Sequence, residues 1–261
     1  MKNSLLYCAV GALALAGSGC AYQGSSYGSH SPASYPTPYY GGCGSTYKPQ
    51  GCQTVGGTRI DVEYSREQFV SGDIIEAGNV VGGDTYGAVG YKDAFKPGYR
   101  VSAGLTRDVN ANTTVSARGF YKKAKAEDPF VVATNGGGNV TGSFSDYKSY
   151  GAELGVRQYM GPSTGGLRPY LGATVGAAYV DDISLTTGGG TTVLNDATWV
   201  PTASGTAGFE VPVSQTASLA LESGIRWEGK QDRAAAASAA GFTDDSSRLS
   251  VPVTLRGSFR F

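Results

Sequence analysis

The sequence predicts an all-β protein: an eight-stranded antiparallel up-and-down transmembrane β-barrel with a flexible N-terminal tether. Three patterns predict this fold. Apolar and polar residues alternate in eight separate segments, long and short connections alternate between those segments, and aromatic residues recur near one end of the apolar face. Composition agrees, because 40 glycines, 17 tyrosines and a charged fraction of only 16% suit strands better than helices.

The alternation is clearest in the last fourteen residues, 248–261. One face holds Leu249, Val251, Val253, Leu255, Gly257, Phe259 and Phe261, and the other holds Arg248, Ser250, Pro252, Thr254, Arg256, Ser258 and Arg260. This is the pattern of a strand with one apolar and one polar face. With Phe259 and Phe261 near its end, the segment resembles the C-terminal strand of bacterial outer-membrane β-barrels. The resemblance implies that these aromatics are an assembly signal and that the barrel-assembly machinery is a partner.

Seven further segments show the same period. Their apolar positions are Ile60, Val62, Tyr64; Tyr99, Val101, Ala103, Leu105; Val115, Ala117, Gly119, Tyr121; Tyr150, Ala152, Leu154, Val156; Pro169, Leu171, Ala173, Val175, Ala177, Tyr179; Trp199, Pro201, Ala203, Gly205, Ala207, Phe209; and Leu219, Leu221, Ser223, Ile225, Trp227. The charges occupy the alternate positions: Asp61, Glu63, Arg100, Arg118, Glu153, Arg157, Glu222, Arg226 and Arg256. Because a strand sends alternate side chains to opposite faces, the charges are confined to one face.

The connections alternate in length without exception. The long ones span 66–98, 123–146, 181–198 and 229–246, and the short ones span 108–112, 160–167 and 213–217. An up-and-down barrel with loops on one side of a membrane and tight turns on the other requires this order. An even strand number places both termini on the side of the short turns, which we expect to be the periplasm.

Aromatic residues decide which face points outward. Next to the long connections, the apolar face carries an aromatic girdle of Tyr64, Tyr99, Tyr121, Tyr150, Tyr179, Trp199 and Trp227. Amphipathic rings at one height are typical of a lipid–water interface. A soluble barrel would scatter lysine and glutamate over its polar face, whereas this face shows no lysine. Strands of about 9–11 residues also match a tilted membrane strand.

Residues 58–261 therefore resemble the small eight-stranded outer-membrane barrels of the outer-membrane protein A transmembrane-domain type, often described as porin-like. The resemblance rests on the strand number, Phe261 and the girdle. It implies a bacterial outer-membrane location, with membrane lipid and lipopolysaccharide as partners. Outer-membrane protein A carries a peptidoglycan-binding domain after its barrel, and no such domain is expected here.

The first 21 residues predict an export signal. Lys2 supplies the positive end, residues 5–15 the apolar stretch, and residues 17–21 a small-residue cleavage region. Two cleavage sites remain open: cleavage before Cys20 would leave a lipidated cysteine, and cleavage after Ala21 would give an ordinary exported protein.

Residues 22–57 are rich in Tyr, Ser, Gly and Pro and have no strand or helix period. Such a segment predicts a flexible periplasmic tether. Cys43 and Cys52 are expected to form a disulfide in an oxidising compartment.

Charge balance and the position of the single histidine exclude several classes of function. Equal numbers of basic and acidic residues, 21 of each, give no electrostatic footprint for nucleic acid. Catalysis at a barrel rim generally needs a histidine, and the single histidine, His30, falls in the tether, so we expect no enzyme, cofactor or metal centre. The acidic pairs Asp181–Asp182 and Asp244–Asp245 leave open a weak site for divalent cations that bridge lipopolysaccharide phosphates.

An eight-stranded lumen is just wide enough to be filled by side chains. We therefore expect the inward charges to form an ion-pair network, with Glu222 and Arg226 grouped with Glu153 and Arg157. Two functions remain: a structural or adhesive surface protein that binds an unknown ligand through four long loops, and a narrow porin-like channel. Within the loops, residues 136–138 and 188–190 are expected to be flexible tips, and the alanine run 234–240 to form one or two helical turns.

Overall fold

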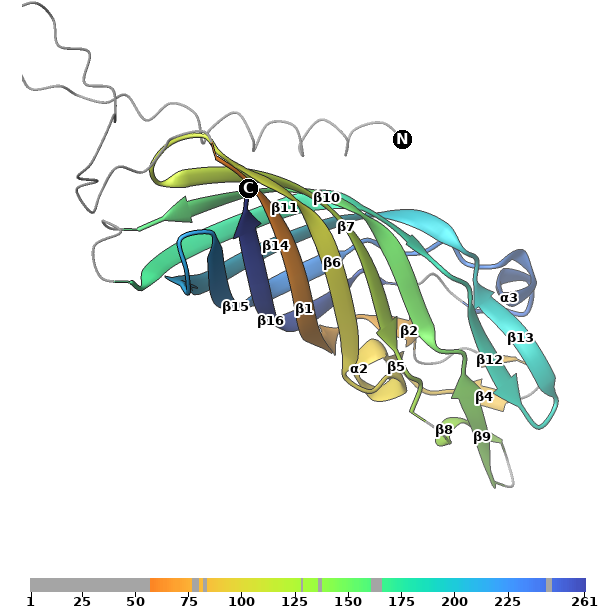
Figure 1. Cartoon of the computed structure of the whole chain (residues 1–261). Helices are drawn as coiled ribbons and strands as arrows, with labels where there is room; N and C mark the ends of the chain where they lie inside the picture. The colour runs from red at the N-terminus through yellow and green to blue at the C-terminus, as the bar shows by residue number, and fades with distance from the viewer. Residues whose placement is uncertain are drawn as a thin grey trace, which may run out of the picture. The chain divides into compact units, whose positions relative to one another are not determined.

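The computed structural model describes residues 57–76, 80–81, 84–127, 129–135, 138–160, 166–242 and 246–261. Eight long strands close into a barrel in the order β1-β16-β15-β14-β11-β10-β7-β6, which confirms the predicted fold class (Figure 1). Their bounds are β1 Thr58–Ser71, β6 Gly98–Asp108, β7 Thr113–Ala124, β10 Tyr147–Tyr159, β11 Arg168–Val180, β14 Thr198–Pro212, β15 Ala217–Glu228 and β16 Arg248–Arg260.

Every neighbouring pair in the barrel is antiparallel, and the first and last strands close it. In the closing pair, Glu63 lies opposite Arg256 and Arg59 lies opposite Arg260. The strands have 11 to 15 residues, so all but β6 exceed the 9–11 predicted. The prediction was short because the period of two continues past the aromatic girdle into segments that were assigned to the long connections.

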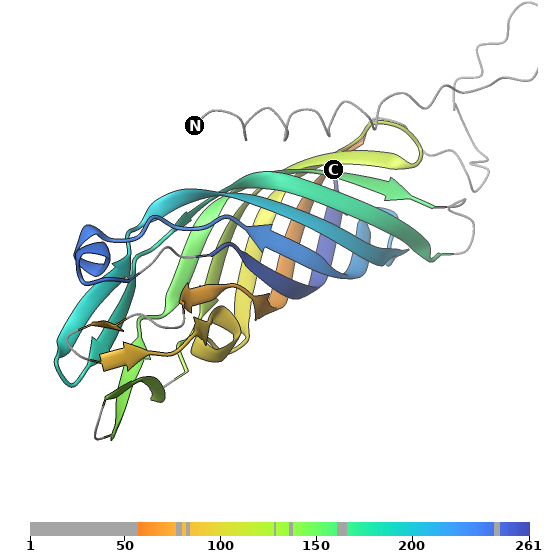
Figure 2. The same cartoon turned by 180° about the vertical axis from the view of Figure 1, so that it is seen from behind.

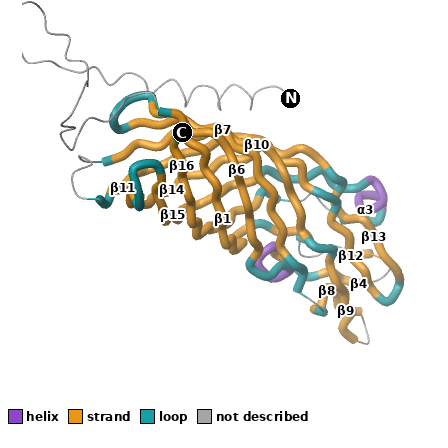
Figure 3. The backbone as a smooth tube through the Cα atoms, in the orientation of Figure 1, coloured by secondary structure: helices purple, strands orange, loops and turns teal. Residues whose placement is uncertain are grey.

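The two ends of the barrel differ, and Figure 3 follows both in the tube. The three short connections, which follow β6, β10 and β14, leave the strands at one end of the barrel, together with the start of β1 and the end of β16; we call this the turn end. At the opposite end, the loop end, the four long connections contain β2 Asp73–Ile75, β3 Val80–Val81, β4 Asp84–Tyr86, β5 Val89–Gly90, α2 Tyr91–Ala94, β8 Phe130–Asn135, β9 Gly138–Phe144, β12 Ile183–Thr187, β13 Gly190–Asn195 and α3 Ala235–Ala239. The helix α3 falls in the alanine run, as predicted.

Three of the four long connections join in one six-stranded sheet of order β13-β12-β9-β8-β4-β3, and Figure 2 shows it from behind. Leu185 of β12 pairs with Phe144 of β9, and Thr85 of β4 pairs with Thr134 of β8. We call this the loop sheet. Residues 188–190, predicted to be a loop tip, lie at the tip of the β12–β13 hairpin, where Gly190 has φ of 128°. Of the second predicted tip, residues 136 and 137 lie outside the described residues.

A hydrophobic core lies at the loop end. Phe69 near the end of β1 contacts the rings of Tyr91, Phe95 and Tyr147, with centroid distances of 5.2 to 6.0 Å. Ile74, Ile183 and Leu194 from the long connections are fully buried in the same core. These aromatic rings occupy the mouth of the barrel, so the loop end is packed with side chains.

The outer face of the barrel is apolar. Ile60, Leu154, Ile225 and Phe259 are 43 to 58% exposed, and they come from four different strands. So continuous an exposed apolar surface marks contact with lipid or a partner. Among the described residues, no helix is long and apolar enough to cross a membrane.

Several predictions fall outside the described residues. These are the export signal 1–21, the tether 22–57 apart from Gly57, the lipidation site Cys20, the Cys43–Cys52 disulfide, and the acidic pair Asp244–Asp245.

Candidate functional site

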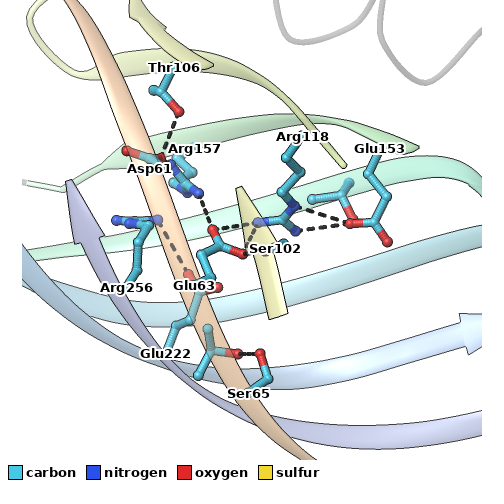
Figure 4. Close-up of polar contacts among 12 residues, drawn as sticks. Asp61, Glu63, Ser65, Ser102, Thr106, Arg118, Glu153, Arg157, Glu222 and Arg256 are labelled. Atoms are coloured by element: carbon cyan, nitrogen blue, oxygen red, sulfur yellow. Dashed lines mark hydrogen bonds and ion pairs between the residues drawn. The ribbon is translucent and has the colours of Figure 1, made fainter. Parts of the chain in front are cut away.

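All nine residues predicted to line the lumen lie inside the barrel and are buried, with exposed fractions of at most 8%. Their positions follow from the pleat, since each is one residue away from an outward-facing apolar neighbour. Figure 4 shows how most of them converge from facing strands. The list is Asp61, Glu63, Arg100, Arg118, Glu153, Arg157, Glu222, Arg226 and Arg256.

Glu63 is the centre of the network. Its two carboxylate oxygens accept hydrogen bonds from Arg118 Nη1 at 2.6 and 2.7 Å, and one also accepts from Arg157 Nη2 at 3.0 Å. Ser102 Oγ donates a further hydrogen bond at 2.8 Å. A single carboxylate on β1 therefore ties together strands β6, β7 and β10.

Each of these two arginines also reaches a second acid. Arg118 lies 3.1 Å from Glu153, and Arg157 lies 2.8 Å from Asp61. Glu153 in turn lies 2.9 Å from Arg100. The shared partners make the cluster continuous, so the charges compensate one another across the barrel and not only in isolated pairs.

The predicted grouping of Glu222 and Arg226 with Glu153 and Arg157 holds in part, because Arg226 Nε lies 3.9 Å from Glu153, whereas Glu222 pairs elsewhere. Glu222 accepts a hydrogen bond from Tyr170 Oη at 2.6 Å and lies 3.6 Å from Arg256, whereas Arg226 donates to Glu67 at 2.5 Å. The two residues are four positions apart on one strand, a rise of about 13 Å. That separation is too long for an ion pair, so both find partners on other strands.

Sequence reasoning missed a second cluster at the turn end. Glu210 of β14 accepts from Arg59 at 3.2 Å, from Arg256 at 2.9 Å and from Tyr159 Oη at 2.7 Å. Arg59 also bonds Asp108 at 3.1 Å. The signal was present, because Arg59 and Glu210 continue the polar alternation by one step beyond the predicted strand ends.

A third cluster, also missed, lies just below the hydrophobic core of the loop end. Lys122 Nζ lies 3.0 Å from Glu67 and 2.9 Å from Glu228, and Glu228 also accepts from Arg248 at 3.0 Å and from Tyr147 Oη at 2.6 Å. The prediction that the inward face has no lysine is therefore wrong. Lys122 lies on the same face of β7 as Arg118, four residues farther along the strand.

The lumen is close to electroneutral. Its buried charges are eight cations, Arg59, Arg100, Arg118, Lys122, Arg157, Arg226, Arg248 and Arg256, and seven carboxylates, Asp61, Glu63, Glu67, Glu153, Glu210, Glu222 and Glu228. Asp108, with a side chain 13% exposed, adds an eighth acid. Unpaired buried charges cost several kcal/mol each, so the balance and the pairing are what allow so many charges to be packed together.

The seven girdle residues lie on the outer face near the loop end. Trp199 and Tyr64 are 60% and 52% exposed, and Trp227 is half-buried. Neighbouring rings touch, with centroids 5.3 Å apart for Tyr150 and Tyr179 and 5.6 Å apart for Tyr179 and Trp199. The register makes this contact direct, since Tyr150, Tyr179 and Trp199 are opposite one another on adjacent strands.

The remaining residues considered for chemistry are the pair Asp181–Asp182 and His30. Within the described residues, no three His, Cys, Asp or Glu side chains come together as a metal site. Asp182 accepts a hydrogen bond from Ser184 Oγ, and His30 lies outside the described residues.

No protein-family description and no curated protein matches the sequence. Several solved structures are similar in fold, among them the following three. Neisserial surface protein A matches at 12% identity and TM-score 0.47, over 78% of this chain and 97% of that chain. Ail, the attachment invasion locus protein of Yersinia pestis, matches at 12% and 0.43, over 80% and 100%. The outer membrane protein OprG from Pseudomonas aeruginosa matches at 14% and 0.45, over 82% and 99%. At identities of 12 to 14% and TM-scores below 0.5, these matches say nothing of function.

Proposed function

We propose that the protein is a non-enzymatic outer-membrane barrel that acts as a structural or adhesive surface protein through the loops at its loop end. Membrane residence is supported by the apolar outer face, on which Leu154 and Ile225 are each 58% exposed, and by the aromatic girdle above it. The observation that carries the proposal is the packed lumen, which leaves the loops as the accessible functional surface.

The packing argues against transport. None of the fifteen buried charged side chains is more than 8% exposed, so a sphere the size of a water molecule barely touches them. A conducting pore needs a continuous hydrated path lined by groups that water can reach. The hydrophobic core around Phe69 and Phe95 adds a dry layer at the loop end. A narrow ion pathway would need exposed, hydrated groups along the lumen, and the described charged side chains there are buried.

The same pairing argues against catalysis in the lumen. A general acid or base must reach a substrate, yet each acid of the central cluster is held by cations. Glu63 is held by Arg118 and Arg157, and Glu153 by Arg100 and Arg118. These groups are structural partners of one another.

The loop sheet supplies a surface suited to binding. Its edge strand β13 exposes Thr191, Thr192 and Val193 and carries no charge or proline, while its far end is partly covered where Ala234 N donates to Leu194 O. An uncharged edge strand presents unpaired backbone groups that a partner strand can join. We infer that an extended segment of a surface partner binds at this edge.

One pair of variants tests the proposal. Thr192→Lys places a charge on the edge of β13, whereas Ala111→Lys adds the same charge in an exposed turn at the other end. Cells displaying each barrel are held on glass, plastic and cultured-cell monolayers under flow. We expect Thr192→Lys to lower retention several-fold, Ala111→Lys to leave it unchanged, and solute flux into proteoliposomes to stay at the protein-free level. Rapid solute flux with equal retention for both variants would overturn the proposal.

A further inference from the structure

We propose that the outer surface at the loop ends of β1, β6, β7 and β10 binds the phosphate groups of a lipid headgroup. Five cations gather there: Arg66, Lys96, Lys123, Lys125 and Lys148, and all are exposed or half-buried. We call them the basic row. This inference goes beyond the proposed binding role of the loops, since it concerns the membrane around the barrel.

The strand register places Arg66, Lys123 and Lys148 of the basic row at one height, and Lys96 and Lys125 lie side by side one step farther from the girdle, where Lys96 N donates to Lys125 O. Arg66 lies opposite Tyr99, Tyr99 lies opposite Lys123, and Lys123 lies opposite Lys148. In Figure 1 the four strands run side by side around one half of the barrel. Because the barrel is closed, β1, β6, β7 and β10 are consecutive neighbours. The row is therefore a continuous band of the outer surface.

The basic row also lies directly above the aromatic girdle. Arg66, Lys123 and Lys148 are each two residues from a girdle tyrosine on the same face of the same strand, namely Tyr64, Tyr121 and Tyr150. Two strand positions correspond to about 7 Å. Tyrosine rings lie at the boundary between hydrocarbon and headgroups, so cations one step farther from the hydrocarbon lie at the height of lipid phosphates.

The charges in the row are incompletely neutralised by the protein. Lys123 lies 2.9 Å from Asp146, and Lys96 lies 3.6 Å from Glu127. Within the described part of the chain, the salt bridges include none for Arg66, Lys125 or Lys148. Two lysines directly opposite each other on paired strands repel. Asp146 offsets part of that repulsion, and a bound phosphate would offset the rest.

Charge of the opposite sign lies on the other half of the rim. On β11, the next strand of the barrel, the residue after the strand end is Asp181. Beyond it, Asp182, Asp196 and Asp232 are exposed. These acids make a second copy of the chain the competing occupant of the basic row. We favour lipid because the row is continuous with the girdle at headgroup height, whereas the exposed acids belong to the long connections.

The test removes two cations at each of two places. Lys125→Gln with Lys148→Gln removes two charges of the row, and the control, Arg107→Gln with Arg168→Gln, removes two charges at the turn end. Each full-length protein, shown to be folded by its heat-dependent gel mobility, is titrated in detergent with a diphosphorylated glycolipid of the lipid A type. The dephosphorylated glycolipid and inorganic phosphate serve as further probes, and native mass spectrometry counts bound lipid and copies of the chain.

We expect the row variant to bind the diphosphorylated glycolipid roughly 30-fold more weakly than wild type, since each cation near a charged headgroup layer contributes about 1 kcal/mol. The control should bind like wild type, and the dephosphorylated lipid should bind weakly to all three proteins. Equal loss in both variants would overturn the site, as would binding of inorganic phosphate alone with the same affinity. The site would also be overturned if wild type formed dimers and the row variant lost the dimer but still bound the diphosphorylated glycolipid normally. None of these outcomes bears on solute flux, so the loop proposal is tested separately.

Discussion

Replacing Glu63 with glutamine tests whether the ion-pair network holds the barrel together. The side chain is 3% exposed and receives hydrogen bonds from Arg118, Arg157 and Ser102. Glutamine has nearly the same shape but no charge, and its amide group would face a guanidinium donor. The substitution therefore removes the electrostatic compensation while leaving little cavity.

The loss of unfolding free energy depends on the ion pairs that Arg118 and Arg157 keep in the variant. Breaking a buried ion pair by removing one partner costs about 3–5 kcal/mol. Arg118 retains Glu153 at 3.1 Å and Arg157 retains Asp61 at 2.8 Å, so neither cation is left alone. We expect the lower end of that range, about 3 kcal/mol of unfolding free energy.

Urea unfolding in lipid vesicles, followed by the fluorescence of the two tryptophans, measures this quantity. Glu127→Gln is the matched control, because Glu127 pairs with Lys96 at 3.6 Å and both side chains are 51% exposed. An exposed pair contributes about 0–1 kcal/mol. If Glu63→Gln proves as stable as Glu127→Gln, the network is not a source of stability and the reasoning fails.

Three further predictions concern the rest of the molecule. Lys122→Met should destabilise the barrel by about 3 kcal/mol in the same assay, because Glu67 and Glu228 lose the cation that they share while each keeps one arginine; unchanged stability would contradict this. The hydrogen bond from Lys123 holds the pKa of Asp146 below its usual value, so the pair stabilises the fold above the unfolded-state pKa and is lost as pH falls through the lowered one. Lys123→Gln should raise the pKa of Asp146 in a carboxyl NMR titration, and no change would refute the pairing. The closed barrel should resist SDS at room temperature and shift in gel mobility only on boiling, since it has no open edge; equal mobility would count against closure.

Much of the barrel was predictable from its sequence because one physical rule decides it. A pleated strand sends alternate side chains to opposite faces, so Asp61 and Glu63 on one side and Ile60 and Val62 on the other fix the inward and outward faces of β1. The structure places all four as expected. The same rule applied a few residues farther would have found Glu67.

The partners of those charges were not predictable. Arg226 meets Glu67 from a strand that is not its neighbour, and such contacts across a lumen depend on strand tilt and side-chain length. The loop sheet was also hidden, because β4, β8 and β12 come from three separate connections. Their pairing is set by how the barrel brings the connections together, and no local pattern records it.

The central claim is that side chains fill the lumen, and ion conductance across a planar bilayer tests it most directly. The wild-type protein should add no steady conductance above the bare membrane. A triple variant, Glu63→Ser with Arg118→Ser and Arg157→Ser, removes only the centre of the network; once its gel mobility shows that it is folded, it should also stay closed, because the turn-end cluster and the loop-end core still fill the lumen. Large, steady conductance steps from the wild-type barrel would contradict the packed lumen and make a channel the better interpretation.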